Sequence, residues 1–272
     1  MSTMIKFESS KIRKSILDMA FAGSTVHIGC AFSIVELLIV LYRNHLRFNS
    51  KCPDDPHRDY LVLSKGHGVM AQYACLHKIG WLNEEDLEKY FGDGTRLKGL
   101  ADTHVPGIEA TTGSLGHGLS VGVGLALSAK LKGTDQICYA IVGDGELNEG
   151  SIWEAVMFAA HFKLDNLIVI VDQNGFQAMG STDEVMSLGN VELKFSAFGF
   201  DAVTVDGHDE NAIDKVLSQF KTTLNGKPKV IVARTIKGKG VTFMENDNSW
   251  HYKRLTEMDY QLAIKEVISK GS

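Results

Sequence analysis

The chain has 272 residues, 44% of them hydrophobic, and a formal net charge of −5 from 28 basic and 33 acidic side chains. This length and composition fit one large globular domain, and the mixture of acids and bases argues against a nucleic-acid-binding surface. Because the sequence contains no apolar run of about 20 residues, it predicts no membrane-spanning helix.

The four cysteines are scattered along the chain, and none forms a Cys-x-x-Cys pair. This usage predicts buried, reduced thiols and a cytoplasmic location, rather than a disulfide framework or a zinc site.

The chain begins with two predicted helices. Apolar residues at helical spacing indicate a first helix over 12–22. A second helix is predicted over 33–42, with Ser33 as its N-cap and Glu36 three residues later, the spacing of a capping box. His27 lies in the turn between them, where a histidine can equally be a surface group or bind the local backbone.

Two further segments place polar groups at the start of helices. Residues 59–63 predict a strand that ends in Ser-Lys-Gly-His-Gly, so His67 is expected at the sheet edge. The alternative is that His67 only caps the helix that follows. Gly113 and Leu115 belong to a glycine-rich segment that opens a helix of small residues, whose first N–H groups can hold anions.

At the centre of the chain the pattern is strand, turn, helix, strand and turn. An apolar run over 137–142 precedes Gly-Asp-Gly-Glu, a helical pattern covers 153–162, and a second apolar run over 167–171 precedes Asp-Gln-Asn-Gly-Phe. A helical crossover makes two such strands parallel and brings their carboxyl ends to one edge of the sheet. Asp144 and Asn174, 30 positions apart, are therefore predicted to converge there.

The chemistry at this edge points to a metal ion. Carboxylate and amide oxygens suit Mg²⁺ or Ca²⁺ rather than zinc, and Mg²⁺ completes its shell with phosphate oxygens and water. Gly143 and Gly145 let a ligand approach the backbone closely. We therefore predict a metal–diphosphate site at the carboxyl edge of a parallel sheet. The alternative is that Asp144 merely caps a helix and Asn174 merely turns a loop.

The last part of the chain adds strands over 202–205 and 229–234 and helices over 211–222 and 257–270. From the sequence alone, the basic, glycine-punctuated segment 235–240 is interpreted as a solvated turn. Together the elements predict an α/β fold, with a central, mostly parallel sheet and helices on both faces.

These motifs carry a family resemblance. The stretch GDGELNEGSIWEA and the later LDNLIVIVDQNGFQ resemble the motif of thiamine-diphosphate enzymes, and within that superfamily they are similar to the amino-terminal half of transketolase. The Ser-Lys-Gly-His segment at His67 and the stretch from Thr235 to His251 resemble the same family. The resemblance implies the thiamine-diphosphate-binding fold, with residues 1–272 as a single pyrophosphate-binding domain.

The resemblance also implies roles for individual residues. Mg²⁺, or Ca²⁺ in its place, would be held by Asp144, Asn174 and the carbonyl oxygen of Phe176. Four histidines would transfer protons and bind substrate hydroxyls: His27, His67, His104 and His251. The cofactor would contact His67, Gly113, Leu115, Gly143, Asp144, Gly145, Glu146, Glu149, Asn174 and His251. Glu149 and Glu154 resemble acids that link paired cofactor sites; the alternative is an ordinary acidic pair at a helix N-terminus.

One loop departs from the family pattern. Where the family has Gly-His-Pro and a spacer before Pro-Gly-Val-Glu, this chain has His104-Val105 directly before Pro106. His104 is the candidate for the family histidine, in an altered register. The shorter loop predicts room for an acceptor larger than a common sugar phosphate.

The implied activity is transfer of a two-carbon ketol unit from a ketose phosphate to an aldehyde or keto acceptor, either an aldose phosphate or a nucleotide-linked sugar. Family enzymes activate the cofactor with a glutamate on a pyrimidine-binding domain. We expect this domain and the C-terminal domain on a separate partner chain, in an α2β2 heterotetramer. Two alternatives are the α subunit of a 2-oxo-acid dehydrogenase, against which the histidine set argues, and a non-catalytic cofactor-binding subunit.

Overall fold

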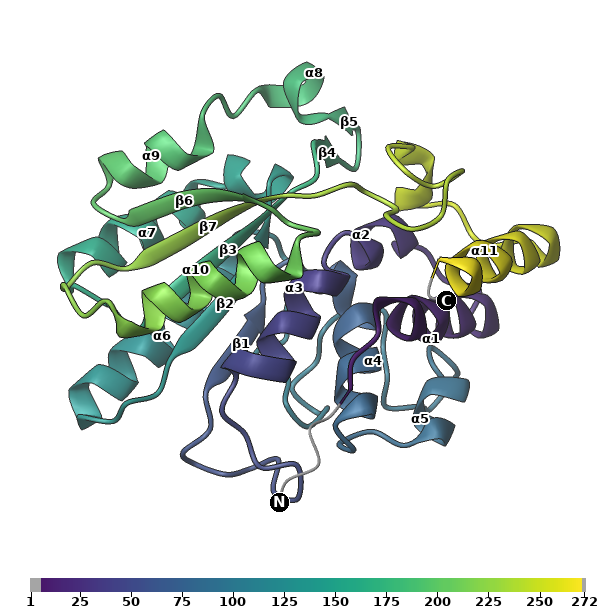
Figure 1. The fold of residues 1–272 in the computed structure, drawn as a ribbon, viewed down its shortest axis with the longest axis horizontal. Helices are drawn as coiled ribbons and strands as arrows, with labels where there is room; N and C mark the ends of the chain where they lie inside the picture. The colour runs from purple at the N-terminus through teal and green to yellow at the C-terminus, as the bar shows by residue number, and fades with distance from the viewer. Residues whose placement is uncertain (1–5, 271–272) are drawn as a thin grey trace.

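The computed structural model describes residues 6–270 and contains a central parallel sheet with helices packed on both of its faces (Figure 1). Every neighbouring pair of strands in the sheet is parallel. The spatial order of the five strands is β1 (Tyr60–Leu63), β2 (Cys138–Gly143), β3 (Leu167–Gln173), β7 (Lys229–Arg234) and β6 (Asp201–Asp206). The predicted fold class is confirmed.

The helices fall into two groups according to the hydrophobic core to which they contribute. One hydrophobic core unites a face of the sheet with α1 (Ser9–Ala22), α2 (Ile28–Phe32), α3 (Val35–Val40), α4 (Val69–Lys78), α5 (Glu84–Glu88), α10 (Glu210–Thr222) and α11 (Glu257–Ser269). A second core covers the opposite face with α6 (His117–Lys132), α7 (Gly150–His161) and α9 (Val191–Ala197).

Strand β3 shows why both faces are covered. Ile168 and Ile170 belong to the first core, and Val169 and Val171 belong to the second. Successive side chains of a strand point to opposite faces, so a strand buried on both faces is a continuous apolar run rather than an alternating one.

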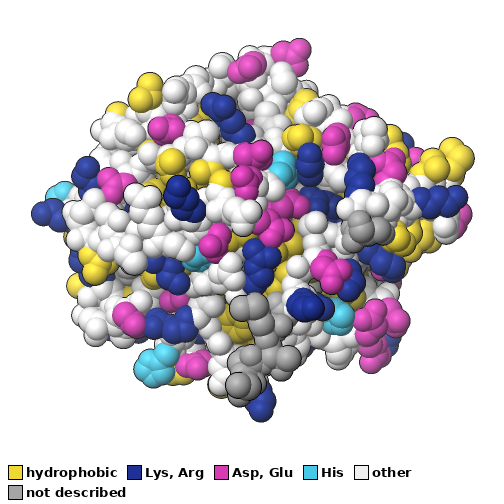
Figure 2. Space-filling model, in the orientation of Figure 1, with side chains coloured by type: hydrophobic (Ala, Val, Ile, Leu, Met, Phe, Trp, Pro, Cys, Tyr) yellow, Lys and Arg dark blue, Asp and Glu magenta, His cyan; other side chains and the backbone are white. Residues whose placement is uncertain are grey.

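Shorter elements complete the chain. A small antiparallel ribbon, β4 (Phe176–Gln177) and β5 (Gly180–Ser181), follows β3 and leads into α8 (Thr182–Met186). A π-helical turn, η1 (Leu41–His45), continues α3, and three short 3-10 turns lie at η2 (Gly66–Gly68), η3 (Gly145–Asn148) and η4 (Asn248–His251). No helix within residues 6–270 is both long and apolar enough to cross a membrane. Acidic and basic side chains are interspersed over the face drawn in Figure 2.

The predicted helix over 33–42 is confirmed from Val35 onward, in α3 and η1, but the predicted Ser33 N-cap is wrong. Ser33 lies between the end of α2 and the start of α3, and its hydroxyl is 3.1 Å from the carbonyl oxygen of Cys30 and 2.8 Å from the carboxylate of Asp172. Glu36 is likewise not part of a capping box, because it is buried and pairs with Arg13 at 2.6 Å. Buried tertiary partners therefore take the polar groups that the local pattern assigned to a cap.

Candidate active site

A pocket of about 540 Å³ lies at the carboxyl ends of the central strands. In the register of β2 and β3, Gly143 stands beside Asp172, so the residues that follow the two strands leave the sheet at the same edge. The pocket gathers twelve of the thirteen predicted site residues: His27, His67, Gly113, Leu115, Gly143, Asp144, Gly145, Glu146, Glu149, Asn174, Phe176 and His251.

Asp144 is a buried carboxylate at the end of β2. It is 1% exposed, and its two oxygens accept hydrogen bonds from the backbone N–H groups of Gly145 at 2.8 Å and Gly175 at 2.6 Å. Burial, and then the nearby charge of Asp172, raise the pKa of Asp144 to about 7. A cation between these groups would relieve that cost, so the site fits the oxygen-ligated metal that the sequence predicted.

Asn174 approaches Asp144 as predicted, because the next residue, Gly175, supplies one of the two N–H groups that bind the Asp144 carboxylate. The Asn174 side chain is held at both ends. Its amide nitrogen donates to Asp172 at 2.8 Å, and its oxygen accepts from the N–H of Phe176 at 3.1 Å. This fixes which end of the amide is the acceptor.

Asp172 is the centre of a buried network that the sequence did not reveal. Its side chain is fully buried and forms an ion pair with Lys65 at 2.5 Å. Ser33, Thr235 and Asn174 donate to the same carboxylate. Burial acts to raise the pKa of Asp172, but the charge of Lys65 and these hydrogen bonds outweigh it and lower the pKa overall. Asp172 is therefore a structural anion that orients Asn174.

Glu146 has a different position from that of the metal candidates. Its buried carboxylate accepts hydrogen bonds from the Ser64 hydroxyl and from the backbone N–H groups of Gly116 and Gly143. It thereby ties together the ends of β1 and β2 and the start of α6. The predicted cofactor contact of Glu146 stays a prediction. Glu149 and Glu154 are both exposed.

Another pocket-lining group has an open hydrogen-bonding position. The side-chain nitrogen of Gln177 is buried and has no hydrogen-bond partner in the described part of the chain. A buried donor of this kind costs free energy unless a ligand satisfies it. The pocket thus offers a donor for an anion beside the carboxylate that suits a cation.

Three of the four predicted histidines lie together. The ring centroids of His27, His67 and His251 are separated by 5.1 to 5.4 Å. The N–H of His27, a residue with a left-handed φ of 69°, donates to the carbonyl of His251 at 3.0 Å and so joins the two segments.

All three imidazoles are neutral at pH 7. Burial, followed by the charges of Lys237 and Lys65, lowers the pKa of His27 to about 4. Burial, followed mainly by Lys237, lowers the pKa of His251 to about 3, and burial lowers the pKa of His67 well below its ordinary value. Neutral imidazoles can both accept and donate a proton, as acid–base and hydroxyl-binding roles require.

Lys237 contradicts the interpretation of 235–240 as a solvated turn. It is 1% exposed, and its ammonium donates to Asn248 at 2.7 Å and to Nδ1 of His251 at 3.0 Å. The loop folds inward because its lysine satisfies buried acceptors on the carboxyl-terminal segment. Since an ammonium only donates, Nδ1 of His251 accepts, and the proton of this neutral ring is on Nε2.

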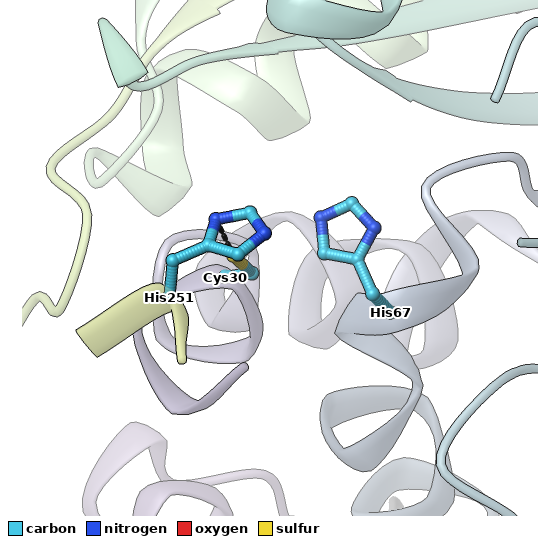
Figure 3. Close-up of side chains that lie close together, drawn as sticks. All are labelled: Cys30, His67 and His251. Atoms are coloured by element: carbon cyan, nitrogen blue, oxygen red, sulfur yellow. Dashed lines mark hydrogen bonds between the residues drawn. The ribbon is translucent and has the colours of Figure 1, made fainter. Parts of the chain in front are cut away.

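Cys30 also lies at this cluster. Its sulfur is 3.5 Å from Nδ1 of His251, and Figure 3 shows the ring of His67 beside these two side chains. One ligand atom from each of the three residues lies within 4.8 Å of the others. Sequence spacing could not reveal this group, because positions 30, 67 and 251 meet only through the tertiary fold.

His104 is the predicted residue that does not join the others. It does not line the pocket; its side chain is 79% exposed, and Nδ1 lies 2.5 Å from a carboxylate oxygen of Asp102. Leu100 lines the pocket instead, and also borders a second cavity of about 540 Å³ beside His27. A catalytic role for His104 stays a prediction.

Comparisons with known proteins agree with this geometry. The family model described as transketolase, thiamine diphosphate binding domain, matches residues 6–267. A protein of Phocaeicola vulgatus, one of the subunits of an apulose-4-phosphate transketolase, is 39% identical over 263 residues, which cover 97% of this chain and 93% of that protein. The 6-deoxy-6-sulfo-D-fructose transketolase subunit SqwG from Clostridium sp. is 39% identical, with 98% of both chains covered.

Solved structures give the same result. A transketolase from Campylobacter jejuni superposes with a TM-score of 0.90 at 33% identity, and the match covers 98% of this chain and 43% of that one. The chain thus spans less than half the length of this solved relative, whereas it spans nearly all of the two relatives named as subunits.

Proposed function

The chain belongs to the transketolase family, in which it forms the thiamine-diphosphate-binding domain, and we propose that it is the cofactor-binding half of a two-subunit transketolase. The reaction is the transfer of a two-carbon ketol unit from a ketose phosphate to an aldehyde or keto acceptor. The observation that carries this proposal is the convergence of Asp144 and Asn174 on a pocket that also holds three neutral histidines.

The metal and the cofactor have identifiable partners. Mg²⁺ would be held by Asp144, the side-chain oxygen of Asn174 and the carbonyl oxygen of Phe176, with diphosphate oxygens and water completing the shell. The raised pKa of Asp144 supports this assignment, because a buried carboxylate is best stabilised by a cation. The free donor of Gln177 suits a diphosphate oxygen. When bound, thiamine diphosphate supplies the carbon nucleophile and the electron sink.

The histidines of the chain do the remaining work on this side of the pocket. His27 and His67 are neutral and can hold substrate hydroxyls or move a proton. Lys237 fixes the tautomer of His251 by donating to Nδ1, so Nε2–H is the donor that His251 offers.

The partner and the substrates belong to the same proposal. We infer a second subunit that contributes the pyrimidine-binding domain and its activating glutamate, because two relatives of nearly the same length are named as subunits. We infer an α2β2 assembly. We also infer a cytoplasmic location, which the four free cysteines support.

The acceptor is an aldose phosphate or a bulkier keto-sugar, since Leu100 and the adjoining cavity leave space beside His27.

The test is reconstitution with the product of a neighbouring open reading frame. We expect calorimetry to show thiamine diphosphate uptake that depends on Mg²⁺, and the pair to transfer a ketol unit between sugar phosphates. Asp144→Asn should abolish both, whereas Asp93→Asn, at an exposed acid, should change neither. Cofactor uptake that is equal in Asp144→Asn and in the unaltered pair would refute the assignment.

A further inference from the structure

A thiol and two imidazoles from distant segments lie close together (Figure 3), and all three residues line the pocket. Cys30 comes from α2, His67 from η2 and His251 from η4. Cys30 and His251 are buried and His67 is half-buried. Thiolate and imidazole are the ligands of zinc, whereas the oxygen ligands around Asp144 suit magnesium.

The distances match a tetrahedral zinc site. Zinc–sulfur bonds of about 2.3 Å and zinc–nitrogen bonds of about 2.0 Å at a tetrahedral angle place sulfur and nitrogen about 3.5 Å apart. The sulfur of Cys30 and Nδ1 of His251 are already 3.5 Å apart. The three ligand atoms lie within 4.8 Å of one another, so a shift of the His67 ring by roughly 1 Å would bring its nitrogen to the ligand spacing of a tetrahedral site. His27 or a water can supply the fourth ligand.

The protonation states allow binding, with one competitor. Both imidazoles are neutral because burial lowers their pKa values. Burial raises the pKa of the Cys30 thiol, but a coordinated zinc ion displaces a thiol proton outright. Lys237 donates to Nδ1 of His251 at 3.0 Å, so a metal ion that takes this nitrogen must displace the ammonium. Lys237 therefore lowers the affinity of the site for a metal ion.

We propose that Cys30, His67 and His251 form a binding site for a thiophilic divalent cation of the Zn²⁺ class, separate from the oxygen-ligated site at Asp144. Binding itself needs only these side chains. Its consequence rests on the proposed function: because His67 and His251 serve the reaction, an ion bound between them inhibits the enzyme. Zinc is then an inhibitor and magnesium the activator, acting at neighbouring sites of different ligand chemistry.

The test uses Co²⁺ as the spectroscopic probe and the complete chain under reducing conditions. We expect one equivalent of Co²⁺ to give a sulfur-to-cobalt charge-transfer band, which Zn²⁺ removes and excess Mg²⁺ does not. Cys30→Ser should eliminate the band and weaken Zn²⁺ binding by at least about 100-fold, since even partners of metal ligands contribute 10- to 100-fold. Cys52→Ser, at an exposed cysteine, should leave both unchanged.

A second variant tests the competitor. Lys237→Met removes the ammonium that occupies Nδ1 of His251 and should tighten Zn²⁺ binding by about 10-fold or more, on the scale of other neighbours of metal ligands. Circular dichroism confirms that each variant is folded. Absence of the charge-transfer band in the unaltered chain, or its survival in Cys30→Ser, overturns the site.

Activity separates this inference from the proposed function. If the reconstituted pair transfers ketol units, Zn²⁺ should inhibit it, and Cys30→Ser should need a much higher Zn²⁺ concentration for the same inhibition. Equal inhibition in both would overturn the inhibitory role. If the pair is inactive while the cobalt band is present and depends on Cys30, the proposed function fails and the metal site stands.

Discussion

Replacing Asp144 by Asn should stabilise the cofactor-free chain while abolishing cofactor binding. The pKa of Asp144 is raised from 3.8 to about 7 by burial and by the charge of Asp172. A difference of about three pH units, at 1.36 kcal/mol each, corresponds to a cost of about 4 kcal/mol when the carboxyl is ionised in the folded state. Because the folded state holds this proton more tightly than the unfolded state, stability from this group is present at low pH and is lost as pH rises from about 4 to about 7.

The gain from the substitution is smaller than this cost. Asp144 accepts two backbone N–H bonds, and the asparagine oxygen can accept only one of them while its NH₂ group faces the other donor. Such an unsatisfied donor costs about 1–3 kcal/mol. The net expectation at pH 8 is a variant about 1–3 kcal/mol more stable than the unaltered chain, with the advantage shrinking as the pH falls toward 5.

The assay is urea unfolding between pH 5 and pH 8, without metal or cofactor, followed by the fluorescence of the three tryptophans. Asp93→Asn serves as the control, because Asp93 is exposed. A stability difference between Asp144→Asn and the unaltered chain that is constant with pH, or a variant less stable at pH 8, would show that the carboxyl is not strained by its burial.

Three further predictions concern the same edge of the sheet. Lys65→Met should cost about 3–5 kcal/mol in urea unfolding because it leaves the Asp172 charge buried, and adding Asp172→Asn should restore more than half of that loss; two additive losses would contradict the pairing. Gly118→Ala should lower the free energy of unfolding by about 1–3 kcal/mol, because the new Cβ would lie 2.5 Å from the Ser64 hydroxyl. Gly124→Ala, with open space in the same helix, should raise it by about 1 kcal/mol. Equal effects of the two substitutions on thermal unfolding would refute this reasoning. In the reconstituted pair, Mg²⁺ with thiamine diphosphate at 100 times its dissociation constant should raise the free energy of unfolding by about 2.7 kcal/mol, and a chelator should remove this gain. A melting temperature that the chelator does not change would argue against the metal.

The sequence predicted the convergence of Asp144 and Asn174 because the responsible pattern is local. Two apolar runs separated by a helical crossover can only be parallel neighbours or near-neighbours, so Asp144 and Asn174 had to leave the sheet at one edge. The same logic placed His67 after β1. These inferences need only the period of the hydrophobic pattern and the position of glycine-rich turns.

The buried polar network could not be predicted in this way. Lys65 and Asp172 are 107 positions apart, and nothing near either residue indicates that its charge is neutralised. The interpretation of 235–240 as a solvated turn is wrong for the same reason: a lysine among glycines is usually exposed, and only the carboxyl-terminal segment supplies the acceptors that bury Lys237. Ser33 failed as a cap because Asp172 lies within its reach.

The bond between the N–H of His27 and the carbonyl of His251 joins residues that are synthesised far apart in time. At translation rates of about 5–20 residues per second, roughly 10 to 45 seconds pass between the emergence of these two residues. Until then, His27 has neither its backbone acceptor nor the ring of His251 beside it. A nascent chain can therefore build its sheet on the ribosome, but it cannot complete its coenzyme pocket until the stretch around residue 251 has left the exit tunnel.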